Sequence, residues 1–105
     1  MTQIKKQQNN SVKYKFNIPM YGLRREITEK REVEVELRDG ANMAEVIAAM
    51  KQKLPALEGE VIRPGENRLA EEYKFNINGQ FYFDGSDFEL HPGDRIALLV
   101  PMMGG

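Results

Sequence analysis

This chain of 105 residues contains few of the side chains that usually carry out bond chemistry. It has no cysteine, which excludes disulfides, thiolate metal sites and cysteine nucleophiles. His91, beside Pro92 in an expected surface turn, is the only histidine, so a site with several histidine ligands is excluded and we expect no metal. No paired carboxylates, nucleophile–base pair or phosphate-binding loop stands out. The side chains therefore predict a protein that is not itself an enzyme.

The ending Pro101-Met102-Met103-Gly104-Gly105 is the remaining candidate for chemistry. Glycine has no side chain and adopts nearly any backbone conformation, so a Gly-Gly end has a small cross-section and a flexible backbone. The proline stiffens the exit from the preceding strand, and methionine side chains are flexible and apolar. We expect the last four residues to form a flexible tail. A frayed end without a role is the alternative interpretation.

Charge and hydropathy exclude several classes of protein. Fifteen basic and sixteen acidic residues give a net charge of −1, unlike the basic excess of a nucleic-acid-binding protein. No apolar run approaches the roughly 20 residues of a membrane-spanning helix, and the first ten residues do not resemble a signal peptide. We therefore expect a cytoplasmic, single-domain protein that binds neither nucleic acids nor membranes. Residues 1–11 are polar, which predicts a disordered N-terminal arm.

Alternating apolar and polar residues predict several strands. This period of two is clear over residues 12–18 and 32–37, and the glutamates of the second run predict an acidic outer face. We expect Pro19 to end the first strand. The dipeptide Asn78-Gly79 is a strong hairpin signal. Three further strands are predicted at residues 73–77, 80–83 and 95–100.

One helix is predicted after the second strand. Apolar residues recur at spacings of three and four, so they form one buried stripe. Asn42 is a suitable N-cap, and Glu45 stands where the partner in a capping box belongs. Pro55 is expected to end the helix. The stripe consists of Met43, Val46, Ile47, Met50 and Leu54.

The predicted order is strand, strand, helix, strand, short strand, strand. A helix inserted among hairpin-like strands indicates an α+β fold, with one main helix packed on one face of a mixed sheet of four to five strands. The first and last strands are the most apolar, which favours neighbouring central positions for them. Residues 56–72 show only a loose pattern.

The segment from Pro92 to Gly105 resembles the ending of the bacterial and archaeal sulfur carriers, the small subunit of molybdopterin synthase and the thiamine-biosynthesis sulfur carrier. These share Gly-Asp, an apolar strand, a proline, a short apolar linker and a final Gly-Gly, and the element order resembles ubiquitin. The resemblance covers residues 12–105 and implies a ubiquitin-like β-grasp domain over residues 12–101. The exit at Pro101 favours the molybdopterin branch.

In these carriers the terminal glycine is adenylated and then converted into a thiocarboxylate. The resemblance implies that Gly105 is this site, and that Gly104, Met103, Met102 and Pro101 enter the narrow tunnels of partner enzymes. It also implies that no cofactor is bound permanently, since the partner uses the ATP. The implied partners are an adenylating enzyme of the ubiquitin-activating type, the large subunit of molybdopterin synthase, and a sulfur donor such as a cysteine desulfurase or rhodanese.

The hairpin also predicts a partner-binding face. If Phe75 and Ile77 point into the core, the outward residues of the returning strand must point away from the helix, together with alternate residues of the last strand. The resemblance places two of these, Phe81 and Leu99, at contact positions of the family. The alternative is that residues 55–72 fold over this face and bury it. The predicted partner-binding residues are Phe81, Phe83, Leu99 and Ala97.

Several functions remain open at this stage. The leading hypothesis is a sulfur carrier in the synthesis of the molybdenum or tungsten cofactor, as the small subunit of molybdopterin synthase. A sulfur carrier of the thiamine pathway is a close variant. A protein modifier would use the same activated Gly105 but join it to lysines of target proteins. A β-grasp binding module with an inert tail is the last alternative.

Overall fold

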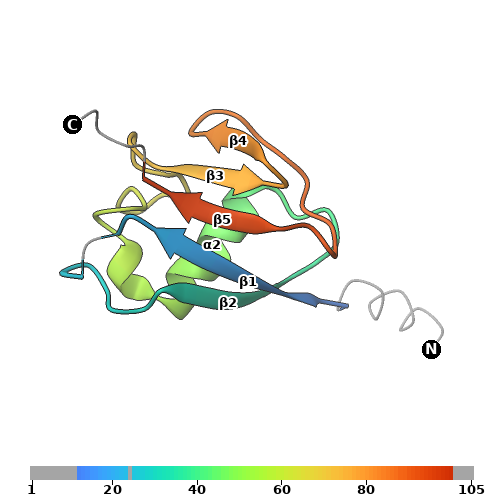
Figure 1. Ribbon diagram of the computed structural model, residues 1–105, viewed down its shortest axis with the longest axis horizontal. Helices are drawn as coiled ribbons and strands as arrows, with labels where there is room; N and C mark the ends of the chain where they lie inside the picture. The colour runs from blue at the N-terminus through green and yellow to red at the C-terminus, as the bar shows by residue number, and fades with distance from the viewer. Residues whose placement is uncertain (1–11, 24, 101–105) are drawn as a thin grey trace.

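The computed structural model describes residues 12–23 and 25–100, and the predicted arm and tail residues 101–105 lie outside this part. Its strands form one sheet in the order β2-β1-β5-β3-β4, with β1 parallel to β5 and the other neighbours antiparallel. Helix α2 lies across one face of the sheet (Figure 1). This is the predicted α+β architecture. In chain order the elements are β1 (Tyr14–Tyr21), β2 (Glu32–Leu37), α2 (Met43–Lys53), the 3-10 helix η1 (Pro55–Leu57), β3 (Lys74–Ile77), β4 (Gln80–Phe83) and β5 (Ile96–Leu99).

Strand β1 continues through Pro19, so the prediction that this proline ends the strand is wrong. The amide of Met20 donates to the carbonyl of Arg31 at 2.9 Å. Because successive residues of a strand point their backbone groups to opposite sides, the nitrogen of Pro19 faces away from β2, and its missing N–H costs no bond to that strand. At the other end, Val12 and Tyr14 are exposed rather than half-buried.

The start of helix α2 is fixed by three side-chain hydrogen bonds. The Asn42 side chain accepts from the Glu45 amide at 2.9 Å, and the Glu45 carboxylate accepts from the Asn42 amide at 2.8 Å, which confirms the predicted capping box. Asp87, far along the chain, accepts from the Met43 amide at 3.0 Å. Since the first amides of a helix have no partner inside it, these bonds satisfy groups that would otherwise need water.

The core lies between α2 and the sheet. The predicted stripe of the helix is buried, except that Leu54 is only partly buried. Alternate residues of the strands face it, and Phe75 of β3 has no exposed surface. This alternation leaves the glutamates of β2 exposed, as predicted.

The loosely patterned segment between α2 and β3 adds to this core, which the sequence did not indicate. It has only isolated bridges, from Ile62 to Glu58 and to Leu69, in place of a strand with regular alternation. Its buried residues therefore follow no period of two or 3.6 that could be recognised. The residues that it buries are Leu57, Val61, Ile62 and Leu69.

The capping box yields a prediction about stability. We expect Asn42→Ala to lower the free energy of unfolding by about 1 kcal/mol, because the Glu45 amide loses its acceptor at the start of the helix. Urea unfolding monitored by circular dichroism measures this change. Asn67→Ala, in an exposed loop, is the matched control and should change the stability by less than about 0.5 kcal/mol. Equal effects of both substitutions would contradict the capping role.

Candidate functional site

Two rows of side chains cross the sheet on the face opposite α2. In the first row, Leu99 of β5 pairs with Tyr21 of β1 and with Lys74 of β3, which in turn pairs with Phe83 of β4. In the second row, Asn76 of β3 stands between Ala97 of β5 and Phe81 of β4. Residues paired across strands lie about 5 Å apart, so each row is one continuous strip. The seven residues of these rows, called here the outer patch, are Tyr21, Lys74, Asn76, Phe81, Phe83, Ala97 and Leu99.

The structure brings the four predicted partner-binding residues together in this patch. Phe81 and Phe83 are 48% and 52% exposed, whereas Ala97 and Leu99 are partly buried between the neighbouring strands. Residues 55–72 leave both phenylalanine rings exposed, so the alternative in which this segment buries them is wrong. Large apolar side chains grouped on an open surface are typical of protein interfaces. Their role in binding stays a prediction.

Lys74 lies among these aromatic rings and was not recognised in the sequence. Its Nζ atom is 4.9 Å from the ring centre of Phe81 and 5.4 Å from that of Phe83. Both distances fit a cation–π interaction. The sequence pattern could have indicated this position, because Lys74 occupies the outward position between Tyr73 and Phe75. The hairpin register then places Lys74 opposite Phe83. The outer patch is therefore apolar with one positive charge inside it.

The segment between α2 and β3 holds the end of β4 rather than covering it. Asp84, directly after Phe83, accepts a hydrogen bond from Arg68 at 2.8 Å and another from Arg63 at 3.2 Å. The hydrogen bond from Arg68 and the two positive charges hold the pKa of the Asp84 carboxyl below its usual range. This ion cluster anchors the strand that presents the two phenylalanines.

A shallow groove of about 510 Å³ adjoins the outer patch. Its walls are β1 on one side and the β3–β4 hairpin on the other, and the start of β5 forms its floor. It shares Tyr21, Asn76 and Ala97 with the patch, so patch and groove form one continuous surface. The other lining residues are Pro19, Asn78, Gly79, Arg95 and Ile96.

The first row of the patch lies where the chain leaves the sheet. The amide of Val100 donates to the carbonyl of Tyr21 at 3.3 Å, which continues the pairing of β5 with β1 by one residue. Gly22 has a φ of +85°, and a Cβ atom built on it would lie 3.1 Å from the Cβ of Val100. A side chain at this position would therefore meet both backbone strain and a close neighbour.

The residues that follow this exit carry the predicted chemistry. Pro101, Met102, Met103, Gly104 and Gly105 lie outside the described residues, and the structure does not test their roles. The structure places Val100, the last residue before them, beside the outer patch.

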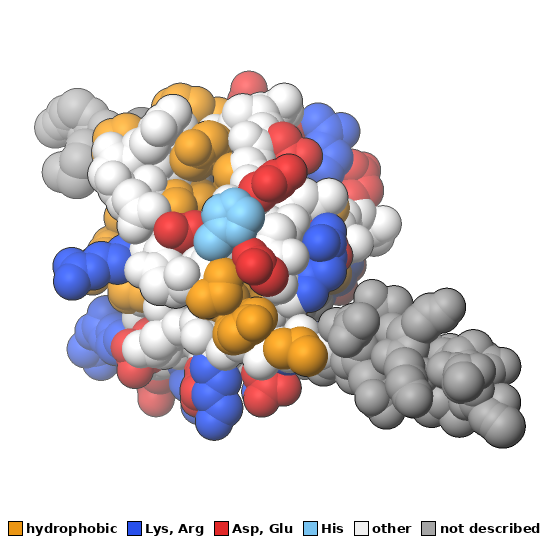
Figure 2. Space-filling model, turned by 90° about the vertical axis from the view of Figure 1, so that its right-hand side faces the viewer, with side chains coloured by type: hydrophobic (Ala, Val, Ile, Leu, Met, Phe, Trp, Pro, Cys, Tyr) orange, Lys and Arg blue, Asp and Glu red, His pale blue; other side chains and the backbone are white. Residues whose placement is uncertain are grey.

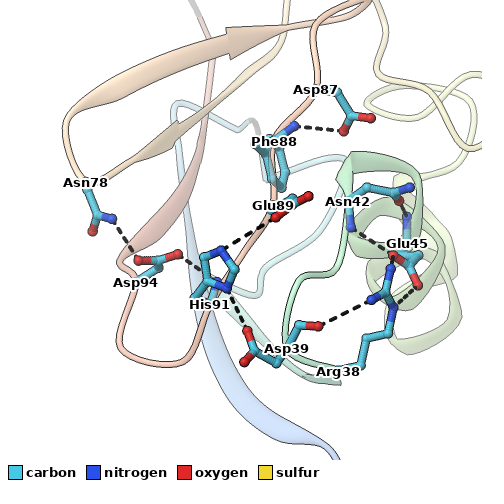
Figure 3. A network of polar contacts seen from close by, with 10 residues as sticks. All are labelled: Arg38, Asp39, Asn42, Glu45, Asn78, Asp87, Phe88, Glu89, His91 and Asp94. Carbon is cyan, nitrogen blue, oxygen red and sulfur yellow. Dashed lines mark hydrogen bonds and ion pairs between the residues drawn. The ribbon is translucent and has the colours of Figure 1, made fainter. Parts of the chain in front are cut away.

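A polar cluster surrounds His91 in the loop before β5. The imidazole Nδ1 lies 2.6 Å from the Asp39 carboxylate, Nε2 lies 3.8 Å from Glu89, and the His91 amide donates to Asp94 at 2.7 Å. Figure 3 shows these contacts joining the loop to the turn before α2, and Figure 2 shows the imidazole at the surface among acidic side chains. The hydrogen bond with Asp39 and the negative charges raise the pKa of His91. The cluster links two loops and confirms His91 as a surface residue.

Within residues 12–23 and 25–100, no three His, Asp or Glu side chains gather in a way that could hold a metal ion. None of the helices described is long and apolar enough to span a membrane.

Comparisons with known proteins agree with this architecture. The family model that matches is described as the ThiS family, and it covers residues 19–105. The structure is similar to SAMP1 from Haloferax volcanii, with a TM-score of 0.68 and 24% identity over 88% of this chain and 100% of that chain. No curated protein sequence matches the chain.

Two further solved structures share the fold. The small archaeal modifier protein 1 of Methanosarcina acetivorans gives a TM-score of 0.62 and 20% identity over 90% of this chain and 100% of that chain. The putative molybdopterin converting factor, subunit 1, of Pyrococcus furiosus gives a TM-score of 0.60 and 22% identity over 84% of this chain and 98% of that chain. These likenesses show that the described residues form a ubiquitin-like β-grasp.

The exposure of Phe81 leads to a prediction about its substitution. We expect Phe81→Asp to leave the fold intact and to change the free energy of unfolding by less than about 1 kcal/mol, because the new carboxylate faces water. The matched change Phe75→Asp places a charge in the core and should abolish folding. Circular dichroism and urea unfolding distinguish the two. Loss of the fold in Phe81→Asp would show that the outer patch is structural.

The His91 cluster predicts a stability that depends on pH. Folding raises the pKa of His91 above its ordinary value of 6.5, so the protonated imidazole is favoured in the folded protein. Its contribution to stability is complete below about pH 6.5 and disappears as the pH rises through the folded pKa. We therefore expect the wild type to have a higher urea midpoint than His91→Gln, with the largest difference at about pH 6. The difference should shrink toward about pH 9, and a difference that grows with pH would contradict the assignment.

Proposed function

Because the chain belongs to the ThiS family of small ubiquitin-like sulfur carriers and modifiers, we propose that it carries sulfur as a thiocarboxylate on Gly105. One observation carries this proposal, namely that the family match extends through Gly104 and Gly105. The exit of the chain beside the outer patch supports it, because a partner that docks on the patch then has these residues within reach.

The proposed chemistry takes place on the backbone carboxylate. A carboxylate is a poor electrophile, so an oxygen of Gly105 first attacks the α-phosphorus of ATP in the adenylating partner, and pyrophosphate leaves. The terminal sulfur of a persulfide on a donor protein then attacks the carbonyl carbon of the acyl-adenylate, and AMP leaves. A thiol of a partner protein attacks the donor sulfur of the resulting acyl disulfide, which forms a disulfide with the donor and releases the thiocarboxylate on Gly105. A cysteine desulfurase or rhodanese fits the donor, because this chain has no thiol of its own. Two glycines let the backbone approach the walls of a narrow active site closely.

The outer patch is the proposed docking surface for these partners. Members of the family work with adenylating enzymes of the ubiquitin-activating type and with larger subunits. Phe81 and Phe83 offer two aromatic anchors of the kind that dominate binding energy at protein interfaces. The Asp84 ion cluster holds their strand in place before binding, which reduces the entropy lost on docking.

The proposed acceptor of the sulfur is a pterin precursor bound to the large subunit of molybdopterin synthase. The likeness to the putative molybdopterin converting factor, subunit 1, of Pyrococcus furiosus supports this assignment, as does the proline at the exit. In this role the chain would be the small subunit of that synthase. A thiamine precursor is the alternative acceptor, since the first two chemical steps are the same.

A protein modifier is the second candidate function. Its support is the likeness to SAMP1 of Haloferax volcanii and to the small archaeal modifier protein 1 of Methanosarcina acetivorans. In a modifier, the amine of a target lysine attacks the activated carbonyl of Gly105 in place of sulfur. Both functions require the same adenylation and differ only in the nucleophile that follows.

The mass of the intact protein distinguishes these functions. In protein purified from its own cells, we expect a species heavier by the difference between one sulfur and one oxygen atom, localised to Gly105 by fragmentation. Deletion of Gly105 should remove this species. Larger covalent products joined through Gly105 would instead establish the modifier. An unmodified mass that persists after incubation with the adenylating enzyme, ATP and a sulfur donor would contradict both.

A further inference from the structure

We propose that the adenylating enzyme, when it docks on the outer patch, presents a carboxylate to Lys74, and that this ion pair at the centre of the interface selects it as the partner. The inference rests on the proposed function, because it takes the patch to be the docking surface. It adds a statement about the partner: an acidic side chain lies within its otherwise apolar contact area.

The position of Lys74 leads to this proposal. Lys74 stands on β3, with Leu99 beside it on β5 and Phe83 beside it on β4. Its ammonium group lies over the rings of Phe81 and Phe83. A partner that covers these two rings therefore also covers the ammonium group, which then lies between the partner and the sheet.

Covering this charge has a cost that only an opposite charge offsets well. A buried ammonium without a partner loses more hydration free energy than the attraction to two aromatic rings returns. The ammonium of Lys74 contacts the rings of Phe81 and Phe83, and the ion pairs among the described residues join the carboxylates of this chain to other cations. The compensating carboxylate must therefore come from the partner, where it would form a charge-assisted hydrogen bond.

The charges elsewhere on the same face oppose other orientations of the partner. The edge strand β2 exposes Glu32, Glu34 and Glu36. In the part of the chain that the structure describes, Lys15 of β1 forms an ion pair only with Glu34, at 3.9 Å, so this edge repels an acidic surface. The groove at the start of β5 is lined by one cation, Arg95. A partner whose acidic groups meet Lys74 and Arg95 is thus directed to the half of the sheet formed by β5, β3 and β4, with Lys74 near the exit at Val100 and Arg95 at the other end of β5.

Binding of lysine variants to the adenylating enzyme tests the proposal. The probe is the purified adenylating enzyme of the ubiquitin-activating type from the same organism, titrated calorimetrically at about 50 and 300 mM NaCl. We expect Lys74→Met to raise Kd at least tenfold at low salt and to reduce its salt dependence, because the pair is lost while the aliphatic stem is kept. Lys74→Glu should bind still more weakly, and Lys74→Arg should stay within about threefold of the wild type.

A matched control separates this effect from net charge. Lys53→Met and Lys53→Glu make the same changes of charge as Lys74→Met and Lys74→Glu on an exposed residue at the end of α2, away from the outer patch, and should leave Kd unchanged. If Lys74→Met binds as tightly as the wild type or more tightly, the proposal is overturned. Such a result would mean that the ammonium group turns away from the interface on docking.

The remaining outcomes distinguish the inference from its premise. If the wild type is adenylated on Gly105 and Phe81→Asp weakens binding, but Lys74→Met does not, the function stands and the inference fails. If the wild type neither binds the enzyme nor exchanges pyrophosphate with it, both fail. A dimer of the wild type in sedimentation equilibrium that Phe81→Asp dissociates would assign the patch to a second copy of the chain and likewise overturn the proposal.

Discussion

The parallel pairing of β1 with β5 is the constraint on which the rest of the structure depends. These strands lie at opposite ends of the sequence, so everything between them must connect two neighbouring parallel strands. Parallel neighbours cannot be joined by a tight turn, because the chain must first return to the end at which β1 began. The connection is made here through α2 on one face of the sheet. That arrangement leaves the opposite face open and makes β1 and β5 end side by side.

The open face and the buried face are produced by the same alternation of residues. In β3, Phe75 and Ile77 point to the core while Lys74 and Asn76 point outward, and a shift of the register by one residue would exchange them. The turn at Asn78-Gly79 fixes this register, with Asn78 in the left-handed region at a φ of +53°. Burial of Phe75 and exposure of Phe81 are therefore two results of one hairpin.

Much of this could be predicted because it depends on local patterns. Period-two alternation, the capping box at Asn42 and the hairpin dipeptide each act within a few residues, and together they gave the architecture and four residues of the outer patch. The errors arose where a long-range contact decides the outcome. The effect of Pro19 depends on which neighbouring strand its nitrogen faces. The burial of Leu57, Val61, Ile62 and Leu69 depends on packing against distant parts of the chain. Lys74 was overlooked because its importance comes from two rings on another strand.

The close approach of Gly22 to Val100 makes the end of β5 sensitive to a residue that is far away in the sequence. The hydrogen bond from the Val100 amide to the Tyr21 carbonyl holds this end against β1, and the space beside the bond suits a glycine. A change in the core alters how much folded protein is present. A side chain at position 22 would do the same, because it would strain the backbone, and it would also press on the residue that ends the pairing of β1 with β5. One position thus links the fit of the two parallel strands to the stability of the whole domain.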